Sequence, residues 1–537
     1  MRLVYYKATT NLLYLNKSNL YMKNHSAISR LYNSSYLTII TLVLFYILWI
    51  VTETPGHNWA GDYSQYIRHA MNLVDGKAYA DTGYIHNTFT FISPSSYPPL
   101  FSLTLAFIYV IFGFNFFAFK VLVASYFMVA LYVALEMTAE KLSKIYQLVF
   151  IVVLALNPYF WLLKNQVLSE YLFMLVVFLT LLVLAKRYTK LDGKYIDSRP
   201  FDIKFGLLIG LLLYLNQATR EIGIVFVPTI LCFEIFHFRK ISLTTVAALI
   251  VFFILNMAGQ ELMEPPKTDK ARSESVSILA KTYNEVNLNK SHLDYISISL
   301  ESISTQVKRY IDAVRHLWPD SSSKLAYIAS VIAFLLFVAF ASAGYIRAIY
   351  YGPGIIEIFV GGYMTILFLF GGFEGLRYMI PIIPVLFLYA FVFHMSMLKT
   401  KFKPLMLVVA VIFSGATGIS YASSDYFSND WEKGVLNPKA QEFFNYVKTS
   451  TPEESIFVYA KPRILALFTG RQASAKPGKH FGDEFLIEYM KAIDATYLIH
   501  SSVEMNGMNG PIEELKLPEK KFELVYTNRY FYIYKRL

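Results

Sequence analysis

Residues 36–53 read YLTIITLVLFYILWIVTE, an apolar run that carries its single charge, Glu53, at the last position. A helix of this length covers nearly all of the ~30 Å hydrocarbon core of a bilayer. The chain is 55% hydrophobic and only 16% charged, a balance whose apolar surface a soluble protein could not bury. Further apolar segments fall at 98–113, 116–138, 145–163, 168–185, 203–219, 221–237, 241–258, 325–346, 353–371, 378–397 and 404–421. The sequence therefore predicts a multispanning α-helical membrane protein with about 11–12 transmembrane segments.

Basic residues between these segments predict the orientation. Residues 1–35 contain five Lys or Arg and no acid, which favours a cytoplasmic N-terminus. Lys and Arg gather again in four later loops, at 186–194, 239–240, 347 and 399–403. This threading places the C-terminal tail outside, whereas twelve full crossings would return it inside. We therefore expect about eleven crossings, with the short segment 98–113 failing to span.

The threading divides the chain into three parts. These are a basic cytoplasmic N-terminus (1–35), a transmembrane domain (36–421) with outer loops at 54–97 and 259–324, and an outward soluble domain (422–537). The net charge of +11 is assigned to the cytoplasmic loops, so the lipid bilayer is the expected partner and nucleic acid is not. The single cysteine, Cys232, excludes an internal disulfide framework.

The last part has the pattern of a small α/β domain. A Pro-initiated helix is predicted at NPKAQEFFNYVK (437–448), followed by a strand at SIFVYA (455–460). A second strand, ATYLIH (495–500), precedes a hairpin at FELVYTNRYFYIYK (522–535) that turns at Asn528-Arg529.

The first outer loop contains WAGDYSQY (59–66) with one acid, Asp62. The apolar positions that follow Asp62 recur at helical spacing, which predicts an amphipathic helix along the outer membrane surface. Asp62 and Gln65 form a plausible capping box, in which Asp62 is an N-cap contributing about 1 kcal/mol. The alternative is that Asp62 performs chemistry, and a cap can also fix a catalytic carboxylate in place.

Three later motifs place charges at the outer ends of predicted segments. After YPPL (97–100), Glu170 follows in NQVLSEYLF, Arg220 in ATREIGIVFVP and Arg377 in EGLRYMIPIIPVL. The tail then opens with YAKPRILALFTGR (459–471).

The order of these motifs along the chain, and their common position on the outer side, resemble the GT-C class of membrane glycosyltransferases. The resemblance is in particular to protein O-mannosyltransferases and lipid A aminoarabinose transferases. The resemblance implies a hexosyl or pentosyl transferase that moves a sugar from a polyprenyl-phosphate-linked donor to a glycan, lipid or protein acceptor, with inversion. It also implies that Asp62 is the general base and that Glu170 is a second catalytic acid, which orients the acceptor or helps to hold a divalent metal. The class often has Asp at the position of Glu170. We assign no metal ligands and no certain cofactor.

The residue types fit that chemistry. Arginine forks match phosphate geometry, so Arg220 and Arg377 are expected to bind the donor phosphate, joined by Lys461 and Arg463. Three aromatic residues are expected to line the sugar: Trp59, Tyr63 and Tyr97. The alternatives are interfacial or solvated charges for the cations and a favourable helix-dipole position for Glu170.

Two other functions compete with transfer, namely a carrier of lipid-linked glycans and a polymerase or ligase of such glycans. A carrier favours charged or broken helices near mid-membrane, whereas the charges here collect at the outer ends. The expected location is a bacterial inner membrane with the site facing the periplasm.

Overall fold

The computed structural model describes residues 35–87, 94–138, 142–287, 300–315, 317, 324–369, 375–397, 414–415, 433–477, 482–503, 507–515, 517 and 520–537. Apolar helices make up most of it: α3 (Ser35–Val51), α5 (Pro99–Phe112), α6 (Phe116–Thr138), α7 (Lys144–Ala155), α8 (Pro158–Lys164), α9 (Glu170–Arg187), α10 (Ile203–Thr219), α11 (Phe226–Phe238), α12 (Leu243–Leu262), α15 (Lys324–Tyr350), α16 (Ile355–Leu369) and α17 (Ile383–Met397).

Three polar helices and two 3-10 turns accompany them: α4 (Asp62–Val74), α13 (Lys267–Asn287), α14 (Leu300–Arg315), η1 (Glu221–Val225) and η3 (Gly375–Met379). The elements after residue 433 are α19 (Pro438–Ser450), β4 (Ile456–Tyr459), α20 (Pro462–Thr469), β5 (Gln472–Ala475), α21 (Gly482–Ala492), β6 (Tyr497–Ser501), β7 (Phe522–Thr527) and β8 (Phe531–Arg536).

Within the described residues, four helical stretches are long and apolar enough to cross a membrane. They are Phe116–Thr138, Glu221–Phe238, Leu243–Leu262 and Ser330–Tyr350, and the pair α7–α8, bent by 58°, would be a fifth. Five further apolar helices are shorter, including the 14-residue α5. Fourteen residues extend about 21 Å, less than the ~30 Å hydrocarbon core, but α16 and α17, with 15 residues each, are almost as short. That 98–113 fails to span therefore stays a prediction. The predicted segment 404–421 lies almost wholly outside the described residues, and the count of 11–12 stays a prediction.

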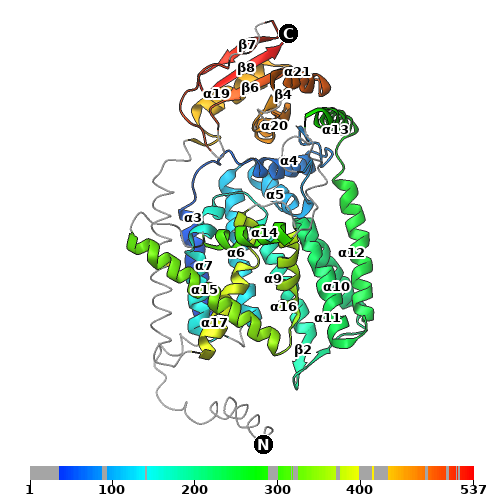
Figure 1. Ribbon diagram of the computed structural model, residues 1–537, viewed down its shortest axis with the longest axis vertical. Helices are drawn as coiled ribbons and strands as arrows, with labels where there is room; N and C mark the ends of the chain where they lie inside the picture. Colours follow the sequence, from blue (N-terminus) through cyan, green and yellow to red (C-terminus); the bar gives the residue numbers. More distant parts are fainter. Residues whose placement is uncertain are drawn as a thin grey trace, which may run out of the picture.

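A six-stranded mixed sheet covers one end of the helices, in the order β1-β5-β4-β6-β8-β7 (Figure 1). The predicted C-terminal elements all appear in it or beside it. Asn437 caps α19, with Pro438 in its first turn, and Arg529 adopts a φ of 70° at the turn between β7 and β8. The interior is aromatic; for example, the rings of Phe443 and Phe531 stack at 4.2 Å.

The edge strand β1 (Tyr84–Ile85) comes from the first loop, more than 380 residues before its partner in the chain. It pairs in parallel with β5, and Asn87 donates to the carbonyl of Ala475 at 2.9 Å. The predicted boundary at residue 422 therefore does not enclose the whole sheet.

The helices between the two ends set the overall layout. α4 and α20 lie between the sheet and the bundle, at what we call the sheet end (Figure 1). α9 starts there and runs to the opposite end, which we call the hairpin end, where it leads into the antiparallel hairpin β2–β3 (Tyr188–Leu191 and Lys194–Asp197). Glu170 begins α9 at the sheet end, and Lys186 and Arg187 lie in its last turn at the hairpin end. The two ends of this helix therefore carry separate charges.

Candidate active site

The helix that carries Asp62 is enclosed by protein rather than lying open on a membrane surface. α4 packs against α5 on one side and α20 on the other. Its polar residues Gln65, His69 and Asn72 are buried along with its apolar ones. The predicted surface helix exists, but the fold covers both of its faces because the C-terminal elements close over it.

The capping-box prediction is wrong. Asp62 is the first helical residue rather than the N-cap, which is Gly61 and makes no side-chain capping bond. Gln65 turns away from the helix start and donates to the carbonyls of Pro94 (3.2 Å) and Ser95 (2.6 Å). The carboxylate of Asp62 is thus available for other partners.

Those partners are arginines. Arg377 donates through Nη1 to Oδ2 of Asp62 at 2.9 Å and through Nε to Oε1 of Glu170 at 2.6 Å. Arg463 donates through Nη1 to Oδ1 of Asp62 at 3.0 Å. Arg220 lies 2.9 Å from the same Oε1 of Glu170. We call these five residues the acid–arginine cluster.

Five separate elements bring the cluster together. Asp62 begins α4, Glu170 begins α9, Arg220 joins α10 to η1, Arg377 lies in η3 and Arg463 lies in the first turn of α20. All of them meet at the sheet end, as the threading of the sequence required.

Local backbone features place two of the arginines. Arg220 is extended (φ −151°, ψ 137°), so the chain leaves α10 and turns back at once into η1. Gly223 permits this reversal, since a Cβ there would overlap the backbone of Asn216. The guanidinium of Arg220 then stacks over the ring of Tyr378, next to Arg377 in the chain, at 4.7 Å. Arg463 follows Pro462, a residue suited to a first helical turn.

The cluster has three positive and two negative charges, a surplus of one positive charge. The side chains of Glu170 and Arg463 are 3% and 7% exposed, whereas those of Asp62 and Arg377 are 20% and 25% exposed. The pair of Asp62 and Arg377 is therefore the part most open to a ligand. Oε2 of Glu170 is buried and has no hydrogen-bond partner among the described residues. A buried carboxylate oxygen without a partner is costly, which favours a ligand donor at this point.

The arginines control the acidity of Asp62. Burial alone would raise the pKa of Asp62, but the charges of Arg377 and Arg463 outweigh it and hold the pKa well below its usual range. Nearby, Lys461 behaves differently: burial, reinforced by the charge of Arg463, lowers its pKa to about 8. Asp62 is thus ionised at neutral pH, whereas the ammonium of Lys461 loses its proton slightly above neutral pH.

Of the three aromatic residues predicted to line a sugar, only Tyr97 is at the cluster. Its hydroxyl lies 3.0 Å from Nη1 of Arg463, and its ring stacks on Tyr66 at 4.4 Å. Trp59 is fully buried between Phe444 and Phe531 and donates to the carbonyl of Lys433. Tyr63 is also fully buried. Its ring stacks on His57 at 3.6 Å. Because both side chains are fully buried, neither Trp59 nor Tyr63 can contact a sugar in this arrangement, and neither belongs to the site.

Two residues that the sequence did not single out border the cluster. The hydroxyl of Tyr66 lies 3.0 Å from Oγ of Ser169, which in turn lies 3.5 Å from Nη1 of Arg220. Tyr66 could have been found from its spacing, because a residue four positions after Asp62 lies on the same helix face.

The two carboxylates do not form a metal site by themselves. No group of three or more His, Cys, Asp or Glu residues in the described part of the chain is arranged to hold a metal ion. Because Asp62 and Glu170 are also bound by arginines, these residues do not fit a metal ion as they stand.

Comparisons with known proteins find similarity in structure alone. No protein-family model matches the chain, and no curated protein matches it in sequence. Among solved structures it is similar to ArnT from Cupriavidus metallidurans bound to undecaprenyl phosphate, with a TM-score of 0.53, 12% identity, and 94% of this chain and 98% of that chain covered. It is also similar to the oligosaccharyltransferase AglB from Archaeoglobus fulgidus, in complex with an inhibitory peptide and a dolichol-phosphate. That comparison has a TM-score of 0.52 and 12% identity, and covers 87% of this chain and 69% of that one.

The chain has the GT-C glycosyltransferase fold. The acid–arginine cluster joins α9 of the bundle to α4 and α20, which lie between the bundle and the sheet. The similarity of fold carries no residue roles with it, so those rest on the geometry above.

Proposed function

We propose that this protein transfers a sugar from a polyprenyl phosphate to an acceptor at the outer face of a membrane, with Asp62 as general base. The observation that carries the proposal is the acid–arginine cluster, in which three arginines from three elements surround two carboxylates and leave a positive surplus. Polyprenyl phosphates accompany both ArnT and AglB in the structures compared above, which supports the same class of donor here. The proposed location remains a bacterial inner membrane, with the sheet end outside.

The cluster can exchange its carboxylates for a donor phosphate. The two carboxylates neutralise two of the three positive charges, and they hold the guanidinium groups that a phosphate would bind. A donor phosphate would draw Arg377 and Arg463 toward itself, because arginine binds phosphate as well as carboxylate and the phosphate brings more charge. Asp62 would then lose the two partners that hold its pKa down, and its affinity for a proton would rise.

The transfer step follows from that exchange. An acceptor oxygen or nitrogen attacks the anomeric carbon of the sugar, and the bond from that carbon to the phosphate oxygen breaks. The acceptor proton passes to Asp62, a contribution of about 10²–10⁴-fold for a well-placed base. The electron pair stays on the leaving polyprenyl phosphate, where Arg220, Arg377 and Arg463 stabilise the growing negative charge. Glu170, through its free Oε2, accepts a hydrogen bond from the acceptor and orients it.

The experiment is mass spectrometry of the lipids that co-purify with the wild-type protein and with Asp62→Asn. Loss of the base stops transfer while the arginines still bind phosphate, so the variant should be enriched in polyprenyl-phosphate sugar relative to wild type. Asp75→Asn, an exposed position at the end of the same helix, is the matched control and should leave the lipid profile unchanged. The absence of polyprenyl lipids from all three proteins would overturn the proposed donor. Full transfer by Asp62→Asn would remove Asp62 from the mechanism.

A further inference from the structure

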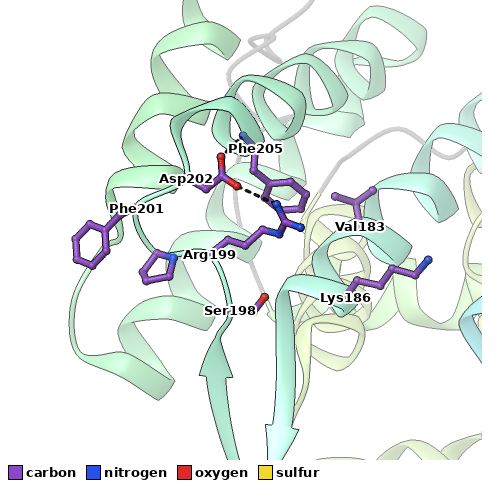
Figure 2. Close-up of a pocket in the computed structure, with 8 residues that line it drawn as sticks. Val183, Lys186, Ser198, Arg199, Phe201, Asp202 and Phe205 are labelled. Atoms are coloured by element: carbon purple, nitrogen blue, oxygen red, sulfur yellow. Dashed lines mark hydrogen bonds and ion pairs between the residues drawn. The ribbon is translucent and has the colours of Figure 1, made fainter.

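A hollow of about 670 Å³ lies at the hairpin end, where β3 leads into α10 beside the end of α9 (Figure 2). Its lining includes Lys186, Ser198, Arg199, Phe201 and Phe205. It is separate from the acid–arginine cluster, since the two occupy opposite ends of α9 (Figure 1). The proposed transfer makes no use of it.

The polar side of the hollow is cationic. Arg199 is held by two contacts: Nη1 lies 2.9 Å from Oδ2 of Asp202, and the guanidinium lies over the ring of Phe205 at 4.7 Å. The other oxygen of Asp202 accepts from the backbone of Phe205 and caps α10, so this acid is occupied (Figure 2). Lys186 is exposed and has no hydrogen-bond or ion-pair partner in the described part of the chain. The residues that line the hollow therefore include two cations and one acid, a net charge of +1.

An apolar surface begins at the edge of the same hollow. Phe201 is 75% exposed, and along α10 a stripe of Ile203, Leu207 and Leu211 is 54%, 48% and 42% exposed. The spacing of four residues places these three side chains on one face of the helix. Apolar side chains this exposed on a long apolar helix face lipid.

We propose that the hollow binds an anionic phospholipid. The headgroup phosphate lies between Lys186 and Arg199, and an acyl chain lies along the stripe of Ile203, Leu207 and Leu211. The combination of cations and an apolar stripe selects this ligand. A free anion would use the cations alone, and a neutral lipid would use the stripe alone. The exposed Lys194 and Lys204 add attraction toward an anionic leaflet without lining the hollow.

The test is native mass spectrometry of the full-length protein in detergent, titrated with phosphatidylglycerol or with phosphatidylcholine. Basic residues near an anionic lipid surface contribute about 1 kcal/mol each, so losing both should weaken phosphatidylglycerol binding by roughly thirtyfold in Lys186→Gln/Arg199→Gln. Lys186→Glu reverses a charge that has no partner to lose, and should weaken binding without disturbing the fold. Lys491→Gln, at an exposed position in the last turn of α21 at the sheet end, is the control and should bind like wild type.

Three results would overturn the proposal. One is phosphatidylglycerol binding within twofold of wild type in both hollow variants. Another is an equal loss of phosphatidylcholine binding, which would show that the cations do not select the headgroup. The third is full competition by millimolar inorganic phosphate, which would make the hollow a site for free anions rather than for a lipid.

Discussion

Gly61 offers a way to disturb the acid–arginine cluster without removing a charge. Its backbone (φ −82°, ψ −15°) is one that alanine adopts without strain. A Cβ at this position would lie 2.7 Å from Nη2 of Arg463 and 3.0 Å from its Cζ. In Gly61→Ala the guanidinium must therefore move until these atoms are at least 3.4 Å apart, where ordinary contact begins. That movement lengthens the 3.0 Å hydrogen bonds from Nη1 of Arg463 to Asp62 and Tyr97.

The size of the effect follows from the hydrogen bond that a displaced Arg463 can no longer make to the donor phosphate. A hydrogen bond to a charged group contributes about 1.5–3 kcal/mol, so a misplaced Arg463 should weaken binding of a polyprenyl phosphate by about 10- to 100-fold. Folding stability should change much less. Alanine restricts the unfolded chain and so gains about 0.4–1 kcal/mol, which offsets part of the weakened ion pair.

The assay is titration of the purified full-length protein with undecaprenyl phosphate, together with thermal unfolding in the same detergent. Gly510→Ala is the control, because a Cβ there meets no atom within 4 Å. An affinity of Gly61→Ala within twofold of wild type would show that Arg463 does not bind the donor phosphate. A large fall in the unfolding temperature would show that the methyl disrupts α4 rather than the guanidinium alone.

Two further predictions concern the other cations of the site. The lowered pKa of Lys461, about 8, means that its ammonium loses its proton as the pH rises through that value, so undecaprenyl phosphate should bind more weakly at pH 9 than at pH 7. Lys461→Arg should remove most of this dependence, and a flat wild-type profile would place Lys461 away from the phosphate. Arg377 holds its two acids through two different nitrogens, which a lysine cannot reproduce, so Arg377→Lys should lower the stability to thermal or chemical unfolding by about 1–3 kcal/mol and weaken phosphate binding. The exposed Arg309→Lys is its control, and equal behaviour of the two variants would contradict the bridging role.

The meeting of Asp62, Glu170, Arg220 and Arg377 could be predicted from the sequence because topology decides it. Glu170, Arg220 and Arg377 lie at the ends of apolar segments and Asp62 lies in the first outer loop, and the threading predicts that all four face the same side of the membrane. Which acid pairs with which arginine could not be predicted, since it depends on turns such as the extended residue Arg220. The bridge that Arg377 makes between two acids had no sequence signal at all.

The errors arose where the C-terminal elements cover the first loop. The sequence predicts that Trp59 and Tyr63 line a sugar because they are aromatic residues of an outer loop. Trp59 instead bonds to the carbonyl of Lys433, 374 residues later in the chain, and that burial could not be foreseen from local pattern. The strand β1 has only two residues, too few for any periodicity to show.

The pairing of β1 with β5 also has a consequence for the order in which the protein is synthesised and folds. Asn87 and its partner Ala475 are separated by 388 positions, and Arg463 is made almost as late. At about 5–20 residues per second, roughly 20–80 s of translation separate the first loop from the strand that completes its sheet. During that interval the bundle can insert while Asp62 still lacks one of its two arginines. A ribosome that stalls, or a protease that removes the last 80 residues or so, would leave a membrane-embedded protein with an incomplete site. Synthesis of α20, which supplies Arg463, is thus the event that completes the site.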